Sequence, residues 1–77
     1  MDVQERVRGI MAEKLGLTEQ ELTPDLDLRS LDWDSLDLLE LVVDLEEEFD
    51  ISVNDQRFSS CSTLHDLTEL ISAALQE

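Results

Sequence analysis

Hydrophobic residues recur every three or four positions in three separate stretches of this chain, which is the spacing of one face of an α-helix. The first stretch predicts a helix over about residues 2 to 15, and Gly16 is a suitable residue to end it. The second predicts a helix from about Ser35 to Phe49, and the third predicts a last helix that ends near Gln76. Three main helices therefore account for most of the chain.

The segments between these stretches carry capping and turn residues. Thr18 and Glu21 have the spacing of a capping box, so we expect a short helical turn there. The residues from Pro24 to Asp34 predict a long loop. Three apolar side chains would attach this loop to the core: Leu26, Leu28 and Leu31. Asn54 can cap a short helix over about residues 55 to 58. The pattern predicts an all-α fold, a small antiparallel bundle of three main helices plus one short helix, in a single domain of residues 1–77.

The predicted helix from Ser35 to Phe49 has two contrasting faces. At about 100° per residue, one arc is apolar and would face the core: Leu38, Leu41, Val42, Leu45 and Phe49. A neighbouring arc, called the acidic stripe below, consists of Asp37, Glu40, Asp44, Glu47 and Glu48. Leu36 and Val43 lie beside the acidic stripe, and Leu39 lies a little further round. These three residues could form part of an interface or pack against the long loop, and Leu39 is the best placed of them to join the core.

The net charge of the chain indicates which classes of molecule it could bind. The chain has 20 acidic and 5 basic residues in 77, a formal net charge of −15, and residues 19–50 hold thirteen of the acids against Arg29 alone. A charge of this sign repels nucleic acid and anionic membranes, and it favours a protein with a basic patch. Hydrophobic residues make up 42% of the chain, which in periodic order suffices for a packed core rather than a disordered acidic tail.

Neither end of the sequence predicts membrane insertion or export. No stretch approaches the roughly 18 apolar residues that span a bilayer, and the N-terminal residues have no signal or transit pattern. The single cysteine, Cys61, cannot form an internal disulfide, which suits a reducing compartment. We expect a cytoplasmic protein in which Cys61 is structural.

Metal binding and hydrolysis are poorly supported by the residues. A calcium loop that started at Asp25 would have Arg29 and Leu36 at two ligand positions, and the register that starts at Asp32 fails in the same way. A serine nucleophile needs a positioned base, and the only histidine, His65, lies at the predicted start of the last helix. We therefore expect no metal site and no enzyme activity.

The run from Leu31 to Leu41, Leu-Asp-Trp-Asp-Ser-Leu-Asp-Leu-Leu-Glu-Leu, resembles the Leu-Gly-x-Asp-Ser-Leu signature of the acyl carrier proteins and the start of their recognition helix. The run from Leu45 to Ile51, Leu-Glu-Glu-Glu-Phe-Asp-Ile, resembles the end of that helix, and the resemblance extends over essentially the whole chain. In this family the serine that matches Ser35 is joined by a phosphodiester to 4′-phosphopantetheine, whose thiol carries acyl groups as thioesters. The resemblance thus implies a helical bundle with this covalent cofactor on Ser35 and an apolar space for the acyl chain.

The same resemblance implies a shuttle that presents acyl intermediates to fatty-acid, polyketide or other specialised lipid biosynthetic enzymes. The expected partners of this monomer are a phosphopantetheinyl transferase and basic-surfaced acyl synthases and acyltransferases. Charges would steer such partners, and flanking apolar side chains would add short-range affinity. We expect the partner surface to comprise Asp34, Leu36, Asp37, Glu40, Val43, Asp44, Glu47 and Glu48.

Two alternatives stay open at this point. A peptidyl or aminoacyl carrier has the same serine and bundle but usually presents Gly-Gly before its serine motif, where this chain has Asp32 and Trp33. An acidic helical adaptor without a cofactor would explain the charges and the fold, but it would leave the Asp34-Ser35-Leu36 placement to coincidence. Asp32 also departs from the glycine of the acyl carrier signature, and the bulky Trp33 precedes Asp34, so a specialised carrier and a housekeeping one both stay open.

Overall fold

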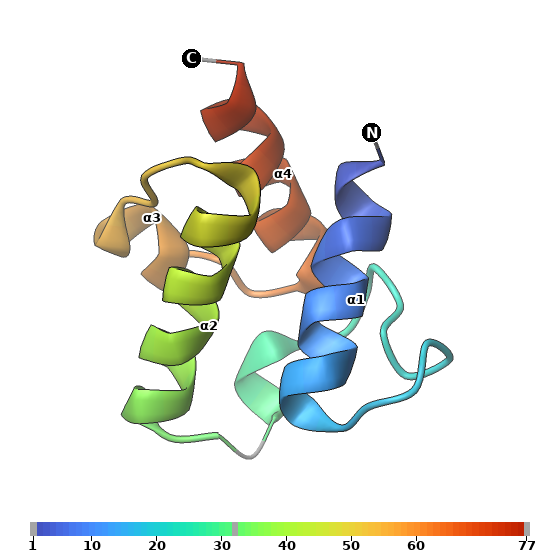
Figure 1. Ribbon diagram of the computed structural model, residues 1–77. Helices are drawn as coiled ribbons and strands as arrows, with labels where there is room; N and C mark the ends of the chain where they lie inside the picture. The colour runs from blue at the N-terminus through green and yellow to red at the C-terminus, as the bar shows by residue number, and fades with distance from the viewer. Residues whose placement is uncertain (1, 32, 77) are drawn as a thin grey trace.

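The computed structural model describes residues 2–31 and 33–76, apart from the side chain of Ser35. Within those residues the chain forms four α-helices: α1 (Val3–Leu15), α2 (Ser35–Phe49), α3 (Asp55–Ser59) and α4 (Leu64–Leu75). Helix α1 runs antiparallel to α2 and α4 and packs against both, while the short α3 packs against α4 (Figure 1). The predicted all-α bundle of three main helices plus one short helix is confirmed. None of the helices in the described part of the chain is long and apolar enough to cross a membrane.

Side-chain caps and one glycine set the helix ends. The Asp2 carboxylate accepts a hydrogen bond from the Glu5 N–H at the start of α1, and Gly16 ends that helix in the left-handed conformation, with φ of 69°. At α4, Thr63 and Asp66 form a capping box in which each side chain accepts the other's backbone N–H. The observed ends of these helices lie within one or two residues of the predicted ones.

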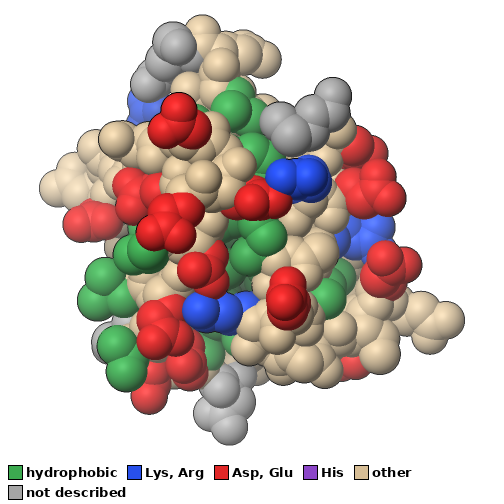
Figure 2. All heavy atoms as spheres, in the orientation of Figure 1, with side chains coloured by type: hydrophobic (Ala, Val, Ile, Leu, Met, Phe, Trp, Pro, Cys, Tyr) green, Lys and Arg blue, Asp and Glu red, His purple; other side chains and the backbone are tan. Residues whose placement is uncertain are grey.

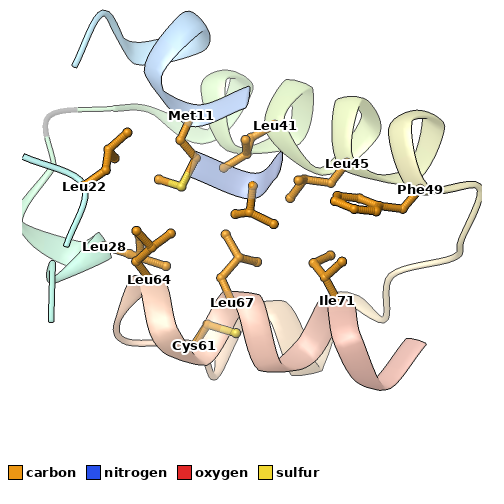
Figure 3. Close-up of a cluster of buried hydrophobic side chains, with 11 residues drawn as sticks. Met11, Leu22, Leu28, Leu41, Leu45, Phe49, Cys61, Leu64, Leu67 and Ile71 are labelled. Carbon is orange, nitrogen blue, oxygen red and sulfur yellow. The ribbon is translucent and has the colours of Figure 1, made fainter. Parts of the chain in front are cut away.

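The core lies where α1, α2 and α4 meet. In Figure 3, Leu41, Leu45 and Phe49 of α2 point toward Leu64, Leu67 and Ile71 of α4, with Met11 of α1 among them. The other members of this buried cluster are Val7, Leu22, Leu28 and Cys61. Helix α2 therefore packs with the apolar face that its sequence pattern predicts.

Two connecting segments before α2 differ from the prediction. The segment around Thr18 is less helical than expected, and the segment from Pro24 to Asp34 is more ordered than expected. Around Thr18 the chain makes only a hydrogen-bonded turn, in which the Glu21 N–H donates to the Thr18 carbonyl over 3.1 Å. The Glu21 carboxylate also accepts bonds from the Thr18 N–H and hydroxyl, which gives only one of the two contacts of a capping box, because the Glu21 N–H does not bond to the Thr18 side chain. The segment from Pro24 to Asp34 contains a 3-10 turn, η1 (Leu28–Ser30).

Backbone hydrogen bonds attach this second segment to the start of α4. The Leu28 N–H donates to the Ser62 carbonyl over 2.8 Å, and the Leu64 N–H donates to the Leu26 carbonyl over 3.0 Å. A third bond joins the His65 N–H to the Pro24 carbonyl over 3.0 Å, so the loop uses two backbone donors in the first turn of α4. Leu28 is buried, and Leu26 and Leu31 pack against the core, as predicted. The loop thereby holds the corner that precedes α2.

Candidate functional site

The corner between the loop and α2 is built around a capping box. The Asp37 N–H donates to Asp34 Oδ1 over 2.9 Å, and the Asp34 N–H donates to Asp37 Oδ2 over 3.3 Å. Asp34 is extended, with φ of −100°, and Ser35 is the first residue of the helix. The side chain of Ser35 and all of Asp32 lie outside the described residues. The two aspartates therefore fix where the helix starts, and with it the backbone position of Ser35.

The other expected partner-binding residues share the exposed side of α2. Asp34, Leu36, Glu40, Val43, Glu47 and Glu48 are exposed, and Asp37 and Asp44 are half-buried. Figure 2 shows acidic side chains gathered over α2, with hydrophobic side chains beside them at the left edge of the view. The structure thus brings the acidic stripe together on one surface of α2.

Cations from α1 border one side of the acidic stripe. The Lys14 ammonium lies 2.7 Å from Asp44 Oδ2 and 3.6 Å from Glu40 Oε2, and Arg6 forms an ion pair with Glu48. The hydrogen bond to the Asp44 carboxylate raises the pKa of Lys14, against the opposing effect of burial. Three of the five acids in the stripe therefore have an intramolecular cation. On a helical wheel Arg6 lies to one side of the apolar face of α1, and Lys14 lies within that face, between Val7 and Ile10, so the sequence does not indicate which acids they contact.

On the other side of the stripe, α2 exposes three large apolar residues that we call the apolar ridge: Leu36, Leu39 and Val43. Their exposed fractions are 63%, 61% and 43%. Leu39, the best placed of the three to join the core, is exposed as well, because it lies about 120° from Leu45 around the helix axis and so points away from α1 and α4. Three exposed apolar side chains within an arc of roughly 60° form a continuous surface feature.

A pocket of about 600 Å³ lies between the loop, α2 and α3. Most of its lining is apolar, and it is bordered by residues that flank Ser35 in the sequence; the lining residues are Leu28, Arg29, Leu31, Trp33, Leu38, Leu39, Val42, Asp55, Phe58, Ser59 and Cys61. Leu38, which was expected in the core, is half-buried here because the first turn of α2 borders this pocket. The volume falls in the range of small-molecule pockets.

The two remaining reactive residue types sit in ordinary surroundings. Burial raises the pKa of the Cys61 thiol, and its Sγ lies 3.5 Å from the Arg57 carbonyl, so this thiol is held in its protonated form at neutral pH. His65 is exposed, and its Nε2 lies 3.5 Å from a carboxylate oxygen of Glu69 one turn along α4. Among the described residues, no group of three or more histidine, cysteine, aspartate or glutamate side chains is placed to hold a metal ion.

A covalently attached arm fits these residues. A serine at the first position of a capped helix is followed by one turn of α2 whose Leu38 and Leu39 border an apolar pocket, and Trp33 borders the same pocket from the preceding loop. Sequence reasoning gave no means to locate this pocket, because Arg29, Asp55 and Cys61 reach it only through the contacts between the loop, α3 and α4. Among the lining residues, Trp33 is the one that the sequence singles out, as a bulky side chain two residues before Ser35.

Comparison with known families agrees with this geometry. A family model described as phosphopantetheine attachment site matches residues 5–71, which is most of the chain. Domains of this family carry covalently attached 4′-phosphopantetheine, and they interact with a phosphopantetheinyl transferase and with synthases. The match decides against an adaptor without a cofactor. The chain therefore belongs to the phosphopantetheine attachment-site family and is a carrier protein for a 4′-phosphopantetheine arm.

Proposed function

We propose that this protein is an acyl carrier protein and that Ser35 is the residue that bears the arm. The observation that supports this assignment is the position of Ser35 as the first residue of α2, directly after Asp34 in the capping box. A residue at that position belongs to a defined corner while its neighbours Asp34 and Leu36 are exposed. A modifying enzyme can therefore approach the corner without unfolding the helix.

The pocket supports an acyl cargo over an aminoacyl one. When bound, the arm supplies a terminal thiol on which acyl groups are carried as thioesters. Trp33, Leu38 and Leu39 border an apolar pocket that would shield a hydrocarbon chain from water. An amino acid with a charged amine would gain little from such walls. The Asp32-Trp33 pair, in place of Gly-Gly, points the same way.

The exposed side of α2 is the proposed surface for partner enzymes, namely the phosphopantetheinyl transferase and acyl synthases or acyltransferases with basic surfaces. Its carboxylates would steer the encounter, and the apolar ridge would add short-range affinity. The only histidine, His65, lies in the first turn of α4 and is not among the residues that form the corner at Ser35. Chemistry on the cargo then belongs to the partners, and this chain contributes attachment, shielding and presentation.

The first prediction tests the attachment residue. Incubation of the unmodified protein with coenzyme A and a broad-specificity phosphopantetheinyl transferase is expected to add one arm, measured as a single mass increment. Ser35→Ala is expected to add none, because it removes the hydroxyl oxygen that forms the phosphodiester.

Ser30→Ala is the matched control. Ser30 lies in η1, five residues before Ser35, and its hydroxyl donates to the Asp27 carbonyl over 2.7 Å. That variant should accept the arm as the wild type does. An arm on the Ser35→Ala variant would show that another hydroxyl is the attachment site, and an acyl-loaded protein isolated from its native host would identify the cargo.

A further inference from the structure

Helix α1 occupies part of the surface that a basic partner would use. Lys14 contacts Asp44 over 2.7 Å and Glu40 over 3.6 Å, and Arg6 contacts Glu48. Glu47 has no such contact among the described residues, and it lies next to Leu36 and Val43 around the helix. The acidic stripe is therefore divided into a side paired with α1 and a side that continues into the apolar ridge.

Exposure shows that this pairing is in reach of a partner. The side chains of Glu40 and Asp44 are 53% and 40% exposed, whereas that of Lys14 is 26% exposed. Lys14 lies in a surface hollow between the two helices that is also lined by Ile10, Glu13 and Glu47. Its ammonium thus approaches the carboxylates from the α1 side, and about half of each carboxylate side chain stays exposed to solvent. A cation from a partner would meet the same two carboxylates from outside.

We propose that Lys14 is an internal competitor for the basic residues of partner enzymes at Asp44 and Glu40, and that it thereby weakens docking on α2. The proposal rests on the proposed function, since it requires a basic partner that docks on this helix. Lys14 offers the same ammonium group that a partner lysine would offer, at a far higher effective concentration because it is part of the same chain. The pairing with Lys14 lowers the local negative potential, so each partner cation gains less at these two carboxylates.

The competitor hypothesis makes a kinetic prediction for Lys14→Met, which keeps most of the aliphatic side chain and removes its charge. With the phosphopantetheinyl transferase and coenzyme A as probe, the KM for the unmodified carrier is expected to fall about two- to fivefold at low ionic strength, with kcat unchanged. The difference should shrink at high ionic strength, because exposed charges are then screened. Lys14→Gln, a second uncharged variant, should behave in the same way.

The matched control separates this local effect from net charge. Arg57→Gln removes one positive charge from α3, where the described ion pairs show no contact between Arg57 and the acidic stripe. It should lower KM less than Lys14→Met does. In an Asp44→Asn background the gain from Lys14→Met should largely disappear, because the carboxylate that Lys14 contacts most closely is then absent. Circular dichroism melts would show that each variant retains the helical fold.

Three outcomes of these measurements would support or overturn the role of Lys14 as a competitor. A fall in KM for Lys14→Met that exceeds the fall for Arg57→Gln, and that depends on Asp44, supports the competitor. Equal KM values for Lys14→Met and Arg57→Gln, or a gain that persists without Asp44, overturn it while the carrier function stands. Failure of the wild type to accept any arm would remove the proposed function, and this inference with it.

Discussion

Asp50 occupies the least comfortable backbone position of the described residues. It follows the last residue of α2 with φ of 54° and ψ of 53°, in the left-handed region, and its N–H donates to the Glu46 carbonyl. A residue with a Cβ is disfavoured there, although aspartate is tolerated better than most. Its carboxylate also lies at the negative end of the helix dipole. Two unfavourable effects therefore coincide at one exposed residue.

Asp50→Gly is expected to stabilise the fold by about 1 kcal/mol, because glycine adopts the left-handed conformation without strain and the negative charge is removed. The free energy of unfolding from urea titration would measure the change. Asp50→Asn separates the two causes, since asparagine removes only the charge, and it should give a smaller gain.

Gly16 provides the opposite control. It ends α1 with φ of 69° and has open space around its Cα, so strain is the main cost of adding a Cβ there. Gly16→Ala should destabilise the fold by roughly 1 kcal/mol. A destabilised Asp50→Gly variant would mean that the Asp50 side chain makes a stabilising contact that outweighs its backbone strain.

At the scale of elements, the helices were predictable and the faces of α2 were only partly so. Helix ends depend on local signals such as Thr63 with Asp66 and Gly16, which the sequence displays directly. The fates of Leu38 and Leu39 depend on where α3 and the loop pack against α2, which no local signal specifies. The partners of Lys14 are likewise contacts between helices distant in the sequence. Local signals thus predicted the capped corner at Ser35, and tertiary contacts produced the pocket and the ion pairs.

The structure also identifies the acid whose reversal best tests docking on α2. Asp37 caps the helix, and Glu40, Asp44 and Glu48 pair with α1, so reversing any of these would also change a contact within the protein. Glu47→Lys avoids both problems. It is expected to lower kcat/KM for transfer of the arm about threefold or more, through slower association that depends on salt.

Two further variants serve as comparisons for Glu47→Lys. Glu69→Lys makes the same charge change on α4, outside the proposed surface, and it should have a smaller effect. Val43→Ala removes part of the apolar ridge, so it should raise the dissociation rate with little salt dependence while the fold survives, because Val43 is 43% exposed. Equal effects of Glu47→Lys and Glu69→Lys on association would place the partner surface elsewhere.

At the scale of the whole molecule, repulsion among acids outweighs the pairing. The chain has 20 acidic residues against 5 basic ones, and the described contacts to lysine and arginine engage only Glu40, Asp44 and Glu48. Folding brings the remaining carboxylates closer together than they are in the unfolded chain. Exposed ion pairs each contribute little, so their loss in salt is a small term beside relief of this repulsion.

The melting temperature is therefore expected to rise with added salt, because screening weakens the repulsion in the compact state more than in the unfolded chain. Each kcal/mol of repulsion removed should raise it by about 4–8 °C for a domain of this size. Thermal melts followed by circular dichroism, from about 10 mM to 500 mM KCl, would measure the slope across the range in which the Debye length falls from roughly 30 Å to below 10 Å. Lys14→Met, with one attraction fewer, should show a steeper slope. A melting temperature that stays flat or falls would mean that the ion pairs between α1 and α2 offset the repulsion among all the other carboxylates.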